Sequence, residues 1–213
     1  MGRSVVEATY RPESLTSTSV LRPYLTVPRL IEDAATKELE RFKRLHTSID
    51  GSPMFNNTAM VTRAQPWHWG HQKSFDALNS ITDPNGKVII VLADVGKRDI
   101  DNPLPPERCE EIIREQLEAK GIPEERYIIY RMPDLNNPPL WGQTIINELR
   151  GRGVVLDAVM SFNPTVTSVF EAYEDITIID PPDTWRGRRG GAVRDGLRKS
   201  GDLVPAEELV LSG

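Results

Sequence analysis

The chain has 213 residues, of which 38% are hydrophobic and 27% are charged, a profile that is typical of a folded globular protein and excludes an intrinsically disordered one. Its formal net charge of −5 and its single cysteine argue against a general nucleic-acid binder, a disulfide framework and a cysteine-based zinc site. Because no apolar run reaches the roughly 18 residues of a membrane span, we expect a cytoplasmic protein of α/β or α+β class that binds neither nucleic acid nor membrane.

The first 57 residues differ from the remainder of the chain. Residues 1–28 are rich in Ser, Thr, Pro and Arg without a regular period, so we expect irregular structure there. Apolar residues at helical spacing then predict an amphipathic helix over residues 28–46; they are Ile31, Ala35, Leu39, Phe42 and Leu45. We expect this helix to dock on the main domain or on a partner subunit. We therefore divide the chain into an N-terminal extension, 1–57, and one domain, 58–213.

From residue 58 onward, short apolar runs alternate with helical patterns. The apolar runs predict five strands, at 59–61, 88–92, 127–130, 158–160 and 176–179. The segments between them predict helices near 70–81, 106–120, 139–150 and 165–172. Buried strands joined by helices are typical of a parallel sheet covered on both faces. We therefore expect an α/β fold, a Rossmann-like doubly wound parallel five-stranded sheet with an N-terminal helical extension, which binds ligands at the carboxyl ends of its strands.

Two of the three histidines, His68 and His71, follow the first expected strand and open the next helix. A helix N-terminus offers unpaired N–H groups and the positive end of the helix dipole, which suit a phosphate, and Gly70 permits close approach of the backbone. A metal pair is one alternative, although no third ligand of suitable type lies nearby in the sequence. A structural role, with the two histidines capping a turn, is the other alternative.

The stretch from Arg63 to His71 reads Arg-x-Gln-Pro-x-His-x-Gly-His. It resembles the signature of the HxGH nucleotidyltransferases, and most closely that of the archaeal-type nicotinamide mononucleotide adenylyltransferases. Further blocks resemble the same family in the same order; they are Asn102 to Arg108, Gly121 to Trp141, Ser161 to Val166, and Arg194 to Pro205. The resemblance covers residues 58–208 and implies the same Rossmann-like fold.

The resemblance implies that a phosphate oxygen of an acceptor attacks the α-phosphorus of a nucleoside triphosphate, and that pyrophosphate leaves. Such a transfer needs positioning and charge stabilisation more than a covalent nucleophile. The catalytic residues that it implies are His68, His71, Arg63 and Arg194. The histidines, best in their protonated form, would bind α- and β-phosphate oxygens, and the two arginines would hold the β- and γ-phosphates.

The other site residues that the resemblance implies fall into two groups. The nucleotide-binding residues are Ala64, Gln65, Gly70, Asn163 and Arg189. The acceptor-binding residues are Arg108, Asp134, Asn136, Asn137 and Trp141, whose ring would stack on the acceptor unless it is plain core. The resemblance also implies Mg²⁺, held by phosphate oxygens and water with no dedicated protein ligands, and assembly as a homo-oligomer.

The chain departs from the family pattern in three places, one of which is that it ends soon after Leu203-Val204-Pro205, where the family usually has another helix. Where the family has Ile-Ser-x-Thr-x-Ile-Arg, residues 188–194 read Arg-Arg-Gly-Gly-Ala-Val-Arg, and arginines crowd residues 186–198. The extension of about 57 residues is not usual in the family. These departures leave three functions open: adenylyl transfer from ATP to nicotinamide mononucleotide, cytidylyl transfer from CTP to a small phosphonate such as phosphonoformate in phosphonate biosynthesis, and non-catalytic nucleotide sensing.

Overall fold

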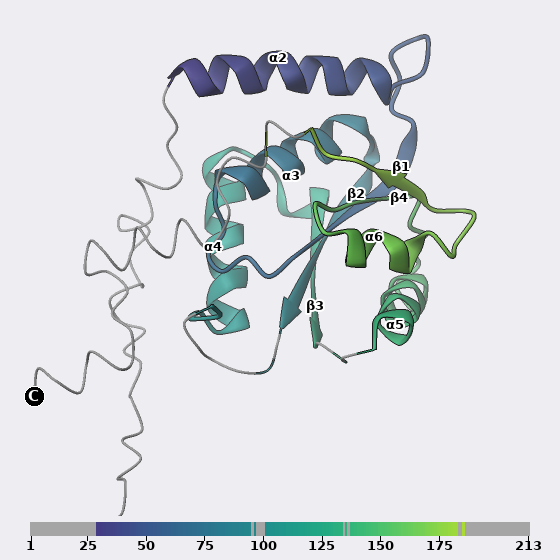
Figure 1. Cartoon of the computed structure of the whole chain (residues 1–213). Helices are drawn as coiled ribbons and strands as arrows, with labels where there is room; N and C mark the ends of the chain where they lie inside the picture. Colours follow the sequence, from purple (N-terminus) through teal and green to yellow (C-terminus); the bar gives the residue numbers. More distant parts are fainter. Residues whose placement is uncertain are drawn as a thin grey trace, which may run out of the picture.

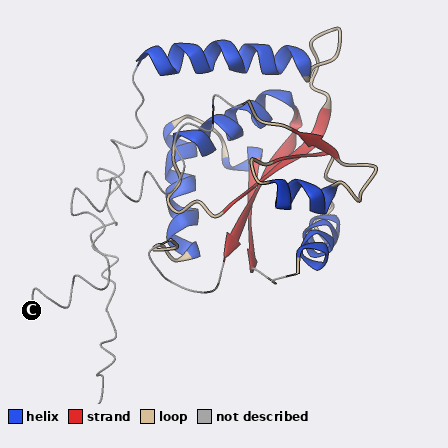
Figure 2. Cartoon of the chain, viewed as in Figure 1, coloured by secondary structure: helices blue, strands red, loops and turns tan. Residues whose placement is uncertain are grey.

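The computed structural model describes residues 29–94, 96, 101–133, 135, 137–182 and 185. Five strands form one sheet in the order β3-β2-β1-β4-β5. Figure 1 and Figure 2 show the sheet with helices packed around it. The strands are β1 (Phe55–Thr62), β2 (Thr82–Asp94), β3 (Tyr127–Pro133), β4 (Ala158–Met160) and β5 (Thr177–Ile179). The helices are α2 (Arg29–Leu45), α3 (Trp69–Ile81), α4 (Pro106–Ala119), α5 (Pro138–Gly151) and α6 (Pro164–Phe170), and a short 3-10 helix, η2 (Glu124–Arg126), precedes β3.

Successive strands are added first on one side of β1 and then on its other side. The chain runs from β1 to β2 and β3 on one side, then crosses to β4 and β5 on the other, and all neighbouring strands are parallel. Helices α3 and α4 cover one face of the sheet, and α5 and α6 cover the other (Figure 1). The predicted α/β fold with a doubly wound, five-stranded parallel sheet is therefore confirmed. Ligands of such sheets bind at the switch point, which here lies at the carboxyl ends of β1 and β4.

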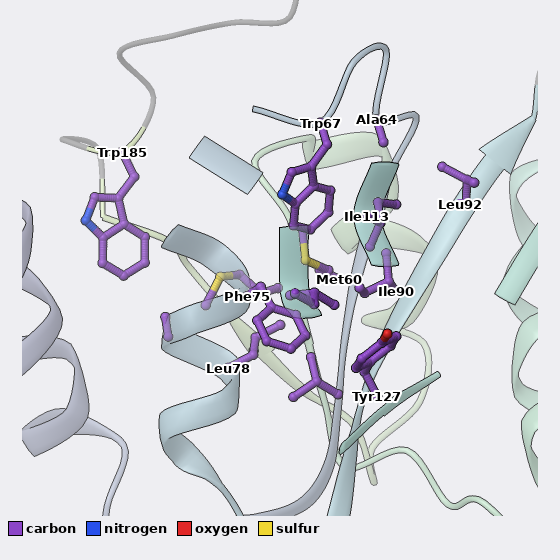
Figure 3. Close-up of a cluster of buried hydrophobic side chains, with 14 of the residues drawn as sticks. Met60, Ala64, Trp67, Phe75, Leu78, Ile90, Leu92, Ile113, Tyr127 and Trp185 are labelled. Atoms are coloured by element: carbon purple, nitrogen blue, oxygen red, sulfur yellow. The ribbon is translucent and has the colours of Figure 1, made fainter. Parts of the chain in front are cut away.

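Successive side chains of the central strands point to opposite faces of the sheet, so the core consists of two clusters, one on each face. Ile90 of β2 belongs to the cluster under α3 and α4, whereas Ile89 and Val91 belong to the cluster under α5 and α6. Figure 3 shows part of the first cluster, in which Phe75 and Leu78 of α3 lie against the sheet. Because both faces of β2 are buried, its sequence is continuously apolar over residues 88–92, and this explains why the strand could be predicted.

Helix α2 docks on the main domain, beside α3 (Figure 1). Ala35 and Phe42 are buried on its inner face, and the Phe42 ring lies 5.6 Å from the ring of Trp185. Leu45, which the helical spacing placed on the same apolar face, is instead 68% exposed, because α2 ends at this residue. The side chain of Ile31 lies outside the described residues. Among the helices that the structure describes, none is long and apolar enough to cross a membrane.

Strand β2 begins directly at the end of α3, at Thr82, and not at residue 88 as its apolar run predicted. The register of its pairing with β1 shifts between Phe55 and Asn57. The backbone carbonyl groups around this junction accept hydrogen bonds from the Arg126 guanidinium; they are those of Asn79, Thr82, Asp83 and Gly86. A side chain from η2 therefore fastens the end of α3 to the start of β2.

Candidate active site

The loop that follows β1 is held in place by side-chain hydrogen bonds. Ala64 has a φ of +47°, which is uncommon for a residue other than glycine, and its N–H donates to the Thr62 hydroxyl at 3.0 Å. The Gln65 side-chain amide donates to the carbonyl of Leu104 and accepts from its N–H, both at 2.9 Å. Gln65, predicted to bind nucleotide, therefore uses its amide to join this loop to the segment before α4.

His68 and His71 form the N-terminal cap of α3. Nδ1 of His68 accepts from the Gly70 N–H at 3.1 Å, and Nδ1 of His71 accepts from the His68 N–H at 3.3 Å. The two rings are stacked, with centroids 3.8 Å apart. This reciprocal arrangement is a capping box in which histidines replace the usual Ser/Thr and Glu/Gln pair. The structural alternative for these residues, that they cap a turn, is confirmed, and their role in phosphate binding stays a prediction.

The hydrogen bonds of this cap assign the protons of both rings. A backbone N–H can only donate, so each Nδ1 is the unprotonated nitrogen and a neutral ring carries its proton on Nε2. Nε2 of His71 lies 2.8 Å from the Thr62 hydroxyl. Burial of the ring lowers the pKa of His71 well below its ordinary value, and the repulsion that a protonated His68 would exert lowers it further. These hydrogen bonds and the lowered pKa give a neutral His71, whereas we expected a protonated form to bind phosphate.

The cap makes folding stability depend on pH. Because the pKa of His71 is lowered in the folded state, the unfolded chain takes up a proton first as the pH falls below about 6.5. We expect the contribution of His71 to be fully present above that pH and to be lost below it, by up to about 1.4 kcal/mol per pH unit. Urea unfolding at a series of pH values measures this slope. His71→Gln, whose amide can close an ordinary capping box, should remove it.

A matched control for that slope is His46→Gln. His46 lies in the turn after α2, where its Nδ1 donates to the carbonyl of Phe42 at 2.9 Å. It is therefore a histidine outside the α3 cap. We expect the His46 variant to keep the pH dependence of the wild-type protein. An unchanged slope in His71→Gln would instead assign the effect to other groups.

Two adjoining cavities lie at the carboxyl ends of β1 and β2. The larger, which we call the large cleft, has a volume of about 640 Å³. It is lined by Val61, Thr62, Arg63, Ala93, Asn137, Pro138, Trp141, Asn163, Thr165, Val166 and Val169. The smaller, which we call the histidine pocket, has a volume of about 270 Å³ and is lined by Thr62, Arg63, Ala64, Gln65, His68, His71 and Asp101. Thr62 and Arg63 line both cavities, so a ligand in one lies close to a ligand in the other.

The large cleft has an apolar wall with polar groups at two helix starts. Trp141 is 8% exposed and packs edge-on against Phe170 at 6.1 Å between ring centroids, so it is part of the core and also part of the cleft wall. Asn137 caps α5 by accepting from the Leu140 N–H at 3.3 Å. Asn163 caps α6 in the same way, by accepting from the N–H of the residue two positions on, at 3.1 Å.

The structure brings most of the predicted site residues together. Five of them line the histidine pocket: Arg63, Ala64, Gln65, His68 and His71. Arg63 lies in the large cleft as well, with Asn137, Trp141 and Asn163. Gly70 does not line the pocket, and it packs closely under the His68 ring, since an added Cβ would lie 3.0 Å from Cε1 of His68.

Other predicted residues are not part of these cavities. Arg108 lies along α4, where its Nη1 donates to Glu111 at 3.0 Å and to Glu115 at 3.2 Å, and it lines neither cavity. The helical spacing could have indicated this, because Glu111 and Glu115 follow Arg108 by three and seven positions and therefore lie on the same face of α4. Four predicted residues lie outside the described residues: Asp134, Asn136, Arg189 and Arg194.

Thr62, Asp101 and Thr165 line the cavities and were not predicted. Thr62 carried a usable signal, since it is a polar residue at the carboxyl end of a buried strand. Among the described residues no group of three or more His, Cys, Asp or Glu is placed to hold a metal ion. Asp101 offers the histidine pocket a carboxylate, and Mg²⁺ is commonly bound by one or two carboxylates together with phosphate oxygens and water. These donors fit an ion that arrives with a nucleotide.

No protein-family model matches the chain. Its fold is similar to that of two structures of a bifunctional NMN adenylyltransferase/ADP ribose pyrophosphatase from Francisella tularensis. One superposes with a TM-score of 0.60 at 18% identity over 69% of this chain. The other, in complex with AMP and a manganese ion, gives a TM-score of 0.56 at 19% identity over 68%. The chain spans less than half of those proteins, 43% and 42% of their lengths. At these identities the likeness shows the fold.

Proposed function

We propose that this protein is a nucleotidyltransferase, which moves a nucleoside monophosphate from a nucleoside triphosphate to a phosphate-bearing acceptor and releases pyrophosphate, as an NMN adenylyltransferase does. The observation that carries the proposal is the pair of adjoining cavities that share Thr62 and Arg63. One is small, polar and built on a helix N-terminus, which suits phosphates. The other is large, with an aromatic wall, and suits the acceptor.

In the proposed reaction the triphosphate lies in the histidine pocket and the acceptor in the large cleft. An acceptor phosphate oxygen forms a bond to the α-phosphorus, and the bond from that phosphorus to the bridging oxygen breaks, so that pyrophosphate leaves. His68 presents a neutral ring with its proton on Nε2, and it would donate that proton as a hydrogen bond to charge that develops on phosphate oxygens. Arg63 would hold phosphates of both ligands, since it lines both cavities.

Further groups complete this proposal. Arg189 and Arg194 would bind the β- and γ-phosphates, because guanidinium groups bind phosphate oxygens in pairs. Asp101 would share a Mg²⁺ ion with the phosphates, and the ion would neutralise part of their charge. Asp134 and Asn136 would contact the acceptor beside Asn137. Arg108 pairs with Glu111 and Glu115 along α4 and lines neither cavity, so the proposal gives it no ligand contact.

The wall of the large cleft favours nicotinamide mononucleotide over a small phosphonate as the acceptor. Val61, Ala93, Val166 and Val169 line it together with Trp141, and Arg63 is the one cationic side chain among its described lining. A small phosphonate carries several negative charges and requires several cations. An acceptor with an aromatic ring, such as nicotinamide mononucleotide, matches this wall better, because its ring can stack on Trp141. Adenylyl transfer is therefore the version that we propose.

Release of pyrophosphate tests the function, with ATP or CTP as donor and nicotinamide mononucleotide or phosphonoformate as acceptor. We expect pyrophosphate with ATP and nicotinamide mononucleotide. Trp141→Ala should raise the KM for the acceptor about tenfold or more, since stacking on an aromatic ring contributes ~1–3 kcal/mol. Trp141→Phe should bring the KM for the acceptor most of the way back to the wild-type value. The KM for ATP should change little in either variant.

The control is Phe170→Leu, which loosens the core behind Trp141 without lining the cleft. It should lower stability and leave the KM for the acceptor close to the wild-type value. Pyrophosphate with CTP and phosphonoformate alone would favour the cytidylyltransferase. A protein that binds nucleotide and yields no pyrophosphate with any pair would be a sensor, and the proposal would be wrong.

A further inference from the structure

We propose that Thr62 is a further ligand-binding residue, whose hydroxyl donates a hydrogen bond to a phosphate oxygen in the histidine pocket and is aligned for this by His71. The ligand class, a triphosphate, rests on the function proposed above. The alignment rests on contacts within the protein. In this proposal Thr62 makes the direct contact with phosphate that the family resemblance implied for His71.

The first step is the direction of the hydrogen bonds. The backbone N–H of His68 donates to Nδ1 of His71, so the proton of the neutral His71 ring is on Nε2. That Nε2 lies 2.8 Å from Oγ1 of Thr62. The ring therefore donates to the hydroxyl oxygen, and Thr62 accepts.

The second step is the capacity of the Thr62 hydroxyl. A hydroxyl oxygen accepts two hydrogen bonds and donates one. Oγ1 of Thr62 accepts from the Ala64 N–H at 3.0 Å and from His71 at 2.8 Å, so both acceptor positions are filled. What remains is the O–H, for which no described residue supplies an acceptor. Thr62 is 8% exposed, and polar groups at this depth normally have a partner.

The third step is the place where this donor lies. Thr62 is the last residue of β1 and lines both cavities. Two donors that fill its acceptor positions leave its O–H a restricted range of directions, and the open space beside it is the cavity. An acceptor that enters there, such as a phosphate oxygen, would complete a chain of three hydrogen bonds. Each bond in such a chain polarises the next one.

The chain also explains why His71 is neutral. A protonated ring would place a hydrogen on Nδ1, where it would face the His68 N–H, and two donors cannot bond to each other. Protonation of His71 would therefore break the cap bond at Nδ1, and the bond from Nε2–H to Thr62 would be disturbed only if the ring then moved. The stacking of His71 on His68, and its packing beside Trp67 at 5.2 Å between centroids, keeps the ring in this position.

Calorimetric binding of inorganic triphosphate by the full chain tests the proposal without a choice of base or acceptor. Thr62→Val keeps the shape of the side chain and removes the hydroxyl. We expect it to weaken binding about tenfold or more, as for loss of one hydrogen bond to a charged group. Thr62→Ser should restore the affinity to within about threefold. The ¹⁵N resonances of His71 should show the Nε2–H tautomer in the wild type and in Thr62→Ser, and a changed Nε2 signal in Thr62→Val.

The matched control is Thr58→Val. Thr58 lies on the same strand, is buried, and bonds through its hydroxyl to Thr82 at 2.7 Å, outside both cavities. We expect it to bind triphosphate as the wild type does. Wild-type affinity in Thr62→Val, or an unchanged Nε2 signal of His71, would overturn the proposal. If the wild type binds and transfers nucleotide in that case, the proposed function stands; if the wild type binds no triphosphate, both are wrong.

Discussion

The His68→Asn variant should fold as stably as the wild-type protein and turn over about 100- to 1000-fold more slowly. Asn is among the best residues at a helix N-cap, so its side chain can accept the Gly70 N–H that Nδ1 of His68 accepts in the structure. It has no counterpart of the Nε2–H that the ring presents. Loss of one hydrogen-bond donor to charge that develops in a transition state typically costs this much in kcat. Pyrophosphate release measures turnover, and urea unfolding measures stability.

His68→Ala is the companion variant, because it removes the cap and the ring together. We expect it to lose about 1 kcal/mol of stability and to be as slow as His68→Asn. Affinity for triphosphate should fall less than turnover in both variants, since a group that acts in the transition state contributes less to the ground state. If His68→Asn turned over at the wild-type rate, the role of His68 would be restricted to capping α3.

The fold was predictable because the central strands are buried on both faces. The apolar run at 88–92 lies within β2, and the histidines mark the start of α3 within one residue. The polar stretch at 82–87 could not be recognised as strand, because its carbonyl groups are bonded by Arg126, a residue distant in the sequence. Local patterns do not contain a partner of this kind. Leu45 was misplaced for a related reason, since spacing identifies a helical face and not the residue at which packing stops.

The site was predictable only in part. The spacing of Gln65, His68 and His71 identified residues that the structure places around one pocket. It did not reveal that both histidines accept backbone N–H groups, because that depends on ring orientation. The position of Thr62 at the carboxyl end of a buried strand was a usable signal, but its contact with His71 is not contained in any local pattern.

The same capping bonds change the physical reason for placing phosphate at α3. The N–H groups of His68 and Gly70 are already bonded to histidine side chains, so they are no longer open donors for a ligand. The positive end of the helix dipole remains, and the side-chain hydrogens on His68 and Thr62 take over the role of donors. At this helix N-terminus we therefore expect side-chain hydrogens, and not these two backbone N–H groups, to bind the phosphate.

The largest expected effect on stability comes from Arg126→Met. The Arg126 guanidinium donates to Oδ1 of Asn79 at 2.6 Å and to carbonyl groups at the end of α3 and the start of β2. Burial lowers its pKa from the ordinary value, and Asp83 opposes this. Met fills a similar volume and donates nothing, so several carbonyl groups lose their partner. We expect the free energy of unfolding to fall by about 3 kcal/mol, measured by urea unfolding at pH 7.

Arg114→Met is the control, because it removes the same charge from a surface position. Arg114 pairs with Glu110 and Glu124 on the outside of the protein, where its side chain is 40% exposed, and exposed ion pairs contribute ~0–1 kcal/mol. A loss confined to Arg126→Met would show that donors at the junction of α3 and β2 matter more than charge. Equal losses in the two variants would contradict this account.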